Sequence, residues 1–253
     1  MISVEDLNFY YGKNLVINSI SAEFKSGKFY CIIGPNGSGK STFLSLISGL
    51  LKANNGNIFI DNIPLFKYAP KSLANKLSLL PQGKILPEIT VEQLVLYGRF
   101  PYMGLTKKPT EADKTAVKSA MRRLEILSLK NRNLKKLSGG EVQKAYIAML
   151  LSQDTPYVLL DEPTANLDAS VTLDIVKLLK ELANSGKCII AVLHDIPTAL
   201  HFADEILVIN NGEVVFNGLP EKAVESGVIN NVFGVKTASV IIEKEKRYIV
   251  FKE

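Results

Sequence analysis

The fold of this chain is limited most narrowly by its glycine-rich segment 34–42, which reads Gly-Pro-Asn-Gly-Ser-Gly-Lys-Ser-Thr. The segment follows Phe29–Ile33, a short apolar run suited to a buried strand. After it, apolar residues recur at helical spacing, namely Phe43, Leu44, Leu46, Ile47, Leu50 and Leu51. A strand that turns through glycines into a helix is typical of an α/β fold, and we expect one here.

The same segment suits phosphate binding. Glycines at 34, 37 and 39 lack a Cβ, so the backbone can adopt positive φ angles and bring N–H groups against phosphate oxygens. Lys40 adds a charge that reaches the β- and γ-phosphates, and the Ser41 hydroxyl is available to Mg²⁺. An ordinary glycine-rich turn would need neither the lysine nor the hydroxyl. We therefore predict a nucleotide site at Gly34, Asn36, Gly37, Ser38, Gly39, Lys40, Ser41 and Thr42.

A second apolar run, Tyr157–Leu160, ends in two adjacent carboxylates, Asp161 and Glu162. Because successive strand side chains point to opposite faces, we expect the two groups to serve different atoms. We assign Asp161 to the shell of a Mg²⁺ ion and Glu162 to an attacking water, which it orients and deprotonates. Without the phosphate loop, a solvated turn before Pro163 would be the better interpretation.

The segment Leu137-Ser-Gly-Gly-Glu141 predicts the start of another helix. Ser138 and Glu141 fit a capping box, whereas Gly139 and Gly140 each cost about 1 kcal/mol relative to alanine inside a helix. Both glycines make sense if the backbone must contact something else. We expect a second anion-binding helix start here, compatible with the capping box and continued by Val142, Tyr146, Met149 and Leu150.

With these motifs in this order, the chain resembles the ATP-binding cassette ATPases over nearly its whole length. The resemblance implies a P-loop NTPase fold: a RecA-like core, an antiparallel β subdomain and an inserted α-helical subdomain. It also implies ATP and Mg²⁺ as ligands, and a head-to-tail homodimer that sandwiches each ATP between the phosphate loop of one subunit and segment 137–141 of the other. Ser138 and Gly140 would then act on the partner's nucleotide.

The resemblance assigns further residues. Gln82 resembles the glutamine that senses Mg²⁺ and the attacking water, and Asp168 resembles a residue of the loop that crosses the dimer interface. His194 resembles the histidine that contacts the γ-phosphate, and its position after the apolar run 188–193 supports this independently. Tyr11 resembles the aromatic that stacks on adenine, although the neighbouring Phe9 and Tyr10 remain alternatives.

The chain departs from the family pattern at two positions, one in segment 137–141 and one shortly after it. Glu141 replaces the commoner glutamine, as in several importer branches, and Gln143 is followed by Lys144 where arginine is usual. A lysine keeps the charge but loses the planar bidentate fork. Neither change affects the catalytic pair.

The chain reads as one domain, with a nucleotide-binding core at 1–85 and 155–253 and a helical subdomain at 86–154. Segments 90–97 and 112–129 have amphipathic helical spacing, and Gly98-Arg-Phe-Pro-Tyr-Met-Gly104 reads as a loop between them. In the family, this subdomain docks on a membrane partner. The loop resembles a stretch found in ATPases that drive uptake of iron chelates, haem and vitamin B12; an ordinary interhelical turn is the alternative.

The composition indicates a folded domain in a reducing compartment. A chain of 253 residues with 47% hydrophobic content can bury a sizeable core. It has no apolar run of about 18 residues and no signal peptide, and Cys31 and Cys188 lie in apolar runs typical of core residues in a reducing compartment. The net charge of +5 is dispersed, so we expect no nucleic-acid partner. The tail from about 238 to 251 alternates like two short strands.

We therefore expect an importer ATPase, at the cytoplasmic face of the membrane, that drives uptake of an iron-siderophore, haem or cobalamin. Its partners would be a second copy, transmembrane permease subunits and, indirectly, an extracytoplasmic binding protein. A soluble single-cassette ATPase of the iron-sulfur assembly type, or an importer ATPase for another substrate such as a metal ion, remains open. Translation and repair ATPases fit less well, since the chain has neither a second cassette nor long heptad coiled coils.

Overall fold

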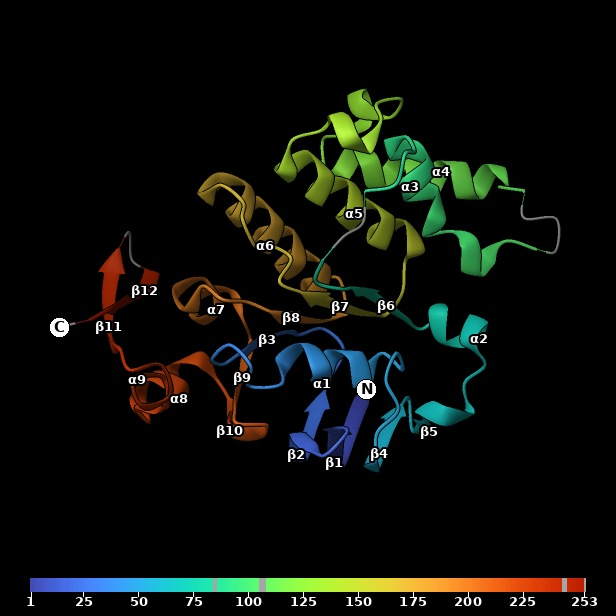
Figure 1. The fold of residues 1–253 in the computed structure, drawn as a ribbon. Coiled ribbons are helices and arrows are strands. Elements are labelled where there is room, and N and C mark those ends of the chain that lie inside the picture. Colours follow the sequence, from blue (N-terminus) through green and yellow to red (C-terminus); the bar gives the residue numbers. More distant parts are fainter. Residues whose placement is uncertain (84–85, 105–107, 243–244, 253) are drawn as a thin grey trace.

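A six-stranded sheet forms the centre of the protein (Figure 1). The computed structural model describes residues 1–83, 86–104, 108–242 and 245–252. Strand order across the sheet is β10-β9-β3-β8-β7-β6, and all neighbours are parallel except β10 and β9. The strands are β3 (Phe29–Ile33), β6 (Leu77–Leu80), β7 (Tyr157–Asp161), β8 (Cys188–Val192), β9 (Glu205–Asn210) and β10 (Glu213–Gly218). The carboxyl ends of β3, β6, β7 and β8 therefore meet at one edge.

A second, antiparallel sheet covers one face of the central sheet. It has the order β2-β1-β4-β5 and comprises β1 (Ile2–Tyr11), β2 (Asn14–Phe24), β4 (Asn55–Ile60) and β5 (Ile63–Pro64). Helix α1 (Lys40–Ile47) packs in the hydrophobic core shared by the two sheets. The helix ends earlier than its apolar spacing predicted, because Gly49 adopts a φ of +78° and leaves Leu50 67% exposed.

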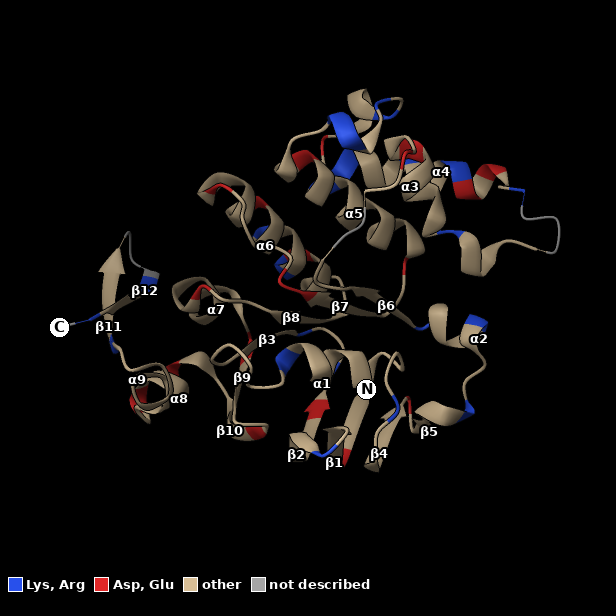
Figure 2. Cartoon of the chain, viewed as in Figure 1, with Lys and Arg blue, Asp and Glu red and all other residues tan. Residues whose placement is uncertain are grey.

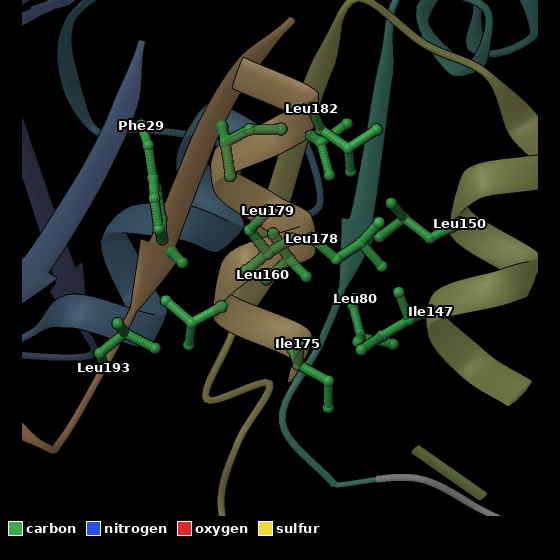
Figure 3. Close-up of a cluster of buried hydrophobic side chains, with 14 of the residues drawn as sticks. Phe29, Leu80, Ile147, Leu150, Leu160, Ile175, Leu178, Leu179, Leu182 and Leu193 are labelled. Atoms are coloured by element: carbon green, nitrogen blue, oxygen red, sulfur yellow. The ribbon is translucent and has the colours of Figure 1, made fainter. Parts of the chain in front are cut away.

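Helices cover the other face. Helix α6 (Ala169–Asn184) lies over the centre of the sheet, with α7 (Ile196–Phe202) beside it and α5 (Gly139–Gln153) over β6. Figure 3 shows Leu179 and Leu182 of α6 among Leu160 of the sheet and Leu150 of α5. Side chains from α3 and α4 belong to the same cluster. The inserted helices therefore share one core with the sheet.

The inserted helical part stands at the top of Figure 1 and contains α3 (Val91–Tyr97), α4 (Glu111–Arg123) and the start of α5. Capping boxes at Thr90 and Thr110 begin α3 and α4. The helix predicted to reach 129 ends at Arg123, because Glu125 has a φ of +58°. One proposed subdomain boundary, at residue 85, lies outside the described residues.

The remaining elements are short. They are α2 (Pro70–Ala74), α8 (Pro220–Glu225), α9 (Val228–Phe233) and the expected pair of terminal strands, β11 (Lys236–Ile242) and β12 (Glu245–Phe251). Residues 243–244 between the two strands lie outside the described residues. No helix in the described part of the chain is long and apolar enough to cross a membrane.

The segment 98–104 has a structural role that the sequence did not reveal. It forms a short 3₁₀ turn at 100–102 that is tied to α4 and α5. The Arg99 Nε atom donates to Asp113 Oδ1 at 2.9 Å, and another Arg99 nitrogen donates to the carbonyl of Ser152 at 2.7 Å. A Cβ at Gly98 would lie 2.1 Å from the carbonyl oxygen of Met149. Packing within this chain therefore explains both Gly98 and Arg99.

We expect Arg99→Met to lower the free energy of unfolding by about 3 kcal/mol, because it leaves the buried carboxylate of Asp113 without its cation. Asp113 is 5% exposed in its side chain. Denaturant unfolding measures the effect. Arg123→Met is the matched control, since Arg123 pairs with Glu181 in solvent at 3.3 Å, and should cost less than about 1 kcal/mol. Equal effects would contradict a structural role for Arg99.

Candidate functional site

Two glycines of segment 34–42 are required by close packing. A Cβ at Gly34 would lie 2.0 Å from the carbonyl oxygen of Ile209, and Gly39 has a φ of +101° with the Val16 carbonyl oxygen 2.9 Å from where a Cβ would stand. Gly37 has open space but a φ of +78°. Only glycine fits these conformations without strain, so the loop is held tightly against β2 and β9. Its backbone is preformed before any ligand arrives.

Lys40, the first residue of α1, folds back onto this loop. Its Nζ atom donates to the carbonyl oxygens of Gly34 at 2.9 Å and Pro35 at 2.8 Å, and the residue is 5% exposed. Burial lowers the pKa of Lys40, while the nearby carboxylates of Glu162 and Asp161 act in the opposite direction. A buried ammonium with two neutral acceptors is a strong site for an anion.

Asp161 lies at the end of β7, against the first turn of α1. Its side chain shares a hydrogen bond with Ser41, yet its Oδ1 atom is buried without a hydrogen-bond partner among the described residues. Burial raises the pKa of the Asp161 carboxyl, although Ser41, Lys40 and the backbone of Gln82 partly stabilise its charged form. A carboxylate oxygen and a hydroxyl are hard donors that suit Mg²⁺, with phosphates and waters completing its shell.

Glu162 follows β7 in a left-handed conformation with a φ of +51°. We had expected strand alternation to separate the two carboxylates. Glu162 lies beyond the end of β7, however, and its left-handed turn is what separates them. The Glu162 Oε2 atom accepts from Gln82 Nε2 at 2.7 Å, and Oε1 lies 2.5 Å from His194 Nε2. The ends of β6, β7 and β8 thus bring three predicted residues into contact.

A cavity of about 530 Å³ opens at this edge of the sheet. Its lining residues are Val16, Asn36, Gly37, Gly39, Lys40, Ser41, Thr42, Gln82, Glu162 and His194. All but Val16 were predicted from the sequence. Val16 was missed because nothing in β2 signals its contact with Gly39.

Two predicted loop residues lie inside the loop, outside the cavity lining. Gly34 and Ser38 are buried, and Ser38 Oγ would be 2.8 Å from a Cβ at Gly34. Tyr11 is also outside the lining, at the end of β1, and is 55% exposed with its ring edge-on to Phe9 at 4.8 Å. Phe9 itself is 8% exposed, which argues against Phe9 as the adenine partner.

The start of α5 is separate from this cavity. The capping box is present: Ser138 Oγ accepts from the Glu141 N–H at 3.3 Å, and the Ser138 N–H donates to Glu141 at 2.8 Å and lowers its carboxyl pKa. A Cβ at Gly139 would meet nothing within 4 Å, and one at Gly140 only Val171 at 3.7 Å. Packing within the chain therefore requires neither glycine. Asp168, exposed before α6, also lies outside the cavity lining.

Helix α5 is present as predicted, and its buried face includes residues that the sequence analysis did not single out. Val142, Tyr146 and Met149 are only partly buried, whereas Gln143, Ala145, Ile147, Ala148 and Leu150 are buried. Gln143 stands one turn before Ile147, and that spacing was the available signal. The amide was overlooked because polar residues seldom occupy such positions.

Charges of both signs are interspersed over the chain (Figure 2). Helix α4, for example, carries Glu111 and Asp113 at its start and Arg122 and Arg123 at its end. Within the described residues, no group of three or more histidine, cysteine or acidic side chains could hold a metal ion without other ligands.

Comparisons with known proteins agree with this geometry. The family model described as ABC transporter matches residues 17–165. The petrobactin import ATP-binding protein YclP of Bacillus subtilis (strain 168) is 37% identical over 253 residues, which cover 99% of this chain and 100% of that protein. The ferric enterobactin transport ATP-binding protein FepC of Escherichia coli (strain K12) is 38% identical over 92% of this chain and 86% of that protein.

Among solved structures, one ATP-binding cassette was captured as a dimer in a post-hydrolysis state bound to ADP and Pi. It is 29% identical to this chain with a TM-score of 0.76, and the match covers 87% of this chain and 99% of that one.

We expect Lys40→Met to weaken the binding of a fluorescent ATP analogue by at least about tenfold, because charge-assisted hydrogen bonds to phosphate are lost. Lys187→Met is the matched control, since Lys187 also donates to a backbone carbonyl, that of Thr155 at 2.8 Å, away from the cavity. Fluorescence titration of both variants decides the matter. An affinity of Lys40→Met equal to that of the control would refute the phosphate site.

Proposed function

The chain belongs to the ABC transporter family of ATPases, and from this premise we propose that it powers an importer for a metal chelate. The family match and the full-length relatives carry the ATPase assignment. The chelate is proposed because the two relatives are named for petrobactin and ferric enterobactin. The observation that carries the chemistry is Glu162, held between Gln82 and His194 beside the loop cavity.

The proposed mechanism uses the groups in the order in which ATP meets them. The loop backbone and the positive end of α1 receive the phosphates, and Lys40 exchanges its carbonyl partners for phosphate oxygens. Ser41 and Asp161 would hold Mg²⁺, with Gln82 close by; the ion neutralises charge on the β- and γ-oxygens. Glu162 accepts a proton from the attacking water, while Gln82 and His194 orient that water and the γ-phosphate.

We further propose that the active unit is a head-to-tail homodimer. The exposed start of α5 supports this, since the glycines at 139 and 140 serve no packing need in their own chain. In the dimer, Ser138, Gly139, Gly140 and Glu141 would contact the partner's nucleotide, and Asp168 would face the partner across the interface. Tyr11 is the most exposed of the three aromatic residues at positions 9–11 and is proposed to stack on adenine.

Membrane permease subunits are the proposed binding partners. An apolar cavity of about 710 Å³, lined by Leu50, Leu65, Phe66, Leu73 and neighbouring residues, opens beside the inserted helical part. Phe66 is 81% exposed and Phe100 of the 98–104 turn is 52% exposed, which suits an apolar partner. The chain would therefore work at the cytoplasmic face of the membrane, and an extracytoplasmic binding protein would reach it only through the permease.

The alternative of a soluble single-cassette ATPase, or of an importer for another substrate, is less well supported. Packing explains Gly98 and Arg99, so the segment 98–104 no longer argues strongly for one branch. The names of the full-length relatives now carry that argument.

We expect Glu162→Gln to retain ATP but to lower turnover by more than about a hundredfold, because the phosphate contacts survive while the base is lost. The ATP-trapped variant, isolated from detergent-solubilised native membranes, should co-purify with a multi-spanning permease. The Lys40→Met variant leaves the proposed docking surface unchanged, so it should carry no trapped ATP and is the control for the nucleotide. Rapid turnover would overturn the role of Glu162, and recovery of soluble scaffold proteins alone would overturn the importer.

We expect Ser138→Arg to lower turnover by more than about tenfold while the chain still binds ATP. The bulky cation would block a surface that only a partner's nucleotide contacts. Light scattering with ATP should show a monomer. Ser185→Arg, the same change at an exposed serine after α6, should leave the dimer and its activity intact. Unchanged turnover in Ser138→Arg would contradict action on the partner's nucleotide.

A further inference from the structure

We propose that Gln143 is a positioning residue that ties the start of α5 to the catalytic base of the same chain. The role rests on the proposed function, in which the start of α5 contacts the partner's ATP and Glu162 serves the chain's own ATP. One side chain would then connect the two nucleotide sites of the dimer.

The contact is direct and buried. The Gln143 side-chain amide donates to the carbonyl oxygen of Pro163, the residue immediately after Glu162. Gln143 is 7% exposed, and Pro163 is buried as well. A buried amide that lost this acceptor, and a buried carbonyl that lost this donor, would each carry a desolvation penalty. The geometry of the two segments is therefore coupled.

Glu162 needs such a support. Its φ of +51° is unusual for a residue with a side chain, and such strain persists only where surrounding contacts fix it. Two backbone bonds act locally: the Glu162 N–H donates to Val192 of β8 at 3.2 Å, and its carbonyl accepts from Ala165 at 3.3 Å. The bond from Gln143 to Pro163 is the contact that comes from α5.

The same turn of α5 also meets the other end of the loop 162–168. A Cβ built on Gly140 would lie 3.7 Å from Val171, in the first turn of α6. The start of α5 therefore lies against both flanks of the loop that carries Glu162 and Asp168. A shift of α5 on engaging a nucleotide would move Pro163, and with it the carboxylate of Glu162.

Replacing Gln143 by methionine keeps the length and volume of the side chain but removes the N–H donor. In the full chain, we expect the kcat for ATP to fall on the order of tenfold and the Hill coefficient for ATP to fall towards 1, because the base is no longer set by the other site. The Kd for a fluorescent ATP analogue should stay within about twofold, since no phosphate contact changes. Gln143→Asn, too short to reach Pro163, should lower kcat in the same way, and the melting temperature of each variant separates this effect from misfolding.

Gln153→Met is the matched control. Gln153 also lies in α5 and donates its amide to a backbone carbonyl, that of Ala74 at 2.7 Å, but at the far end of the helix. It should retain wild-type kcat and cooperativity. The positioning role is wrong if Gln143→Met matches this control. It is also wrong if the kcat, the affinity for ATP and the melting temperature of Gln143→Met all decline together. If the wild type shows no turnover that depends on Glu162, the proposed function fails, and this role fails with it.

Discussion

The parallel pairing of β6, β7, β8 and β3 is the constraint on which the rest of the site depends. Parallel strands point their carboxyl ends the same way, so residues far apart in the sequence arrive at one edge. Gln82, Glu162 and His194 follow three of these strands, and the loop that contains Lys40 follows the fourth. Helices on one face and the antiparallel sheet on the other keep that edge in register. The chemistry is thus assembled by backbone hydrogen bonds remote from it.

The groups assembled there are electrostatically unsatisfied before a ligand binds. Burial lowers the pKa of Lys40 and raises that of Asp161, so each charge is destabilised where it stands. The unpartnered Oδ1 of Asp161 points to the same conclusion. A nucleotide with its cation would give Lys40 an anionic partner in place of its two carbonyls and would give the Oδ1 atom of Asp161 a partner. Shifted pKa values and an unpartnered buried oxygen are characteristic of sites that bind a ligand rather than of sites that stabilise the fold.

Features that depend on neighbouring residues could be predicted from the sequence, and features that depend on distant segments could not. The phosphate loop, the capping box at Ser138 and the strand before Asp161 depend on neighbouring residues, and all three are present. Helix ends were misjudged where a single residue turns left-handed, as at Gly49 and Glu125. Contacts between distant segments, such as Gln143 with Pro163 or Arg99 with Asp113, leave no local pattern to find. The roles of the predicted site residues stay predictions.

Both carboxylate oxygens of Glu162 are already engaged in the chain as it stands, one by Gln82 and one by His194. Each contact occupies one of the two lone pairs on its oxygen, so the carboxylate keeps a lone pair on each oxygen for a water proton. Gln82 and His194 therefore fix the orientation of the Glu162 carboxylate before any ligand arrives. The consequence is that hydrolysis need not wait for the Glu162 side chain to be ordered, since two neighbouring side chains already hold it in place.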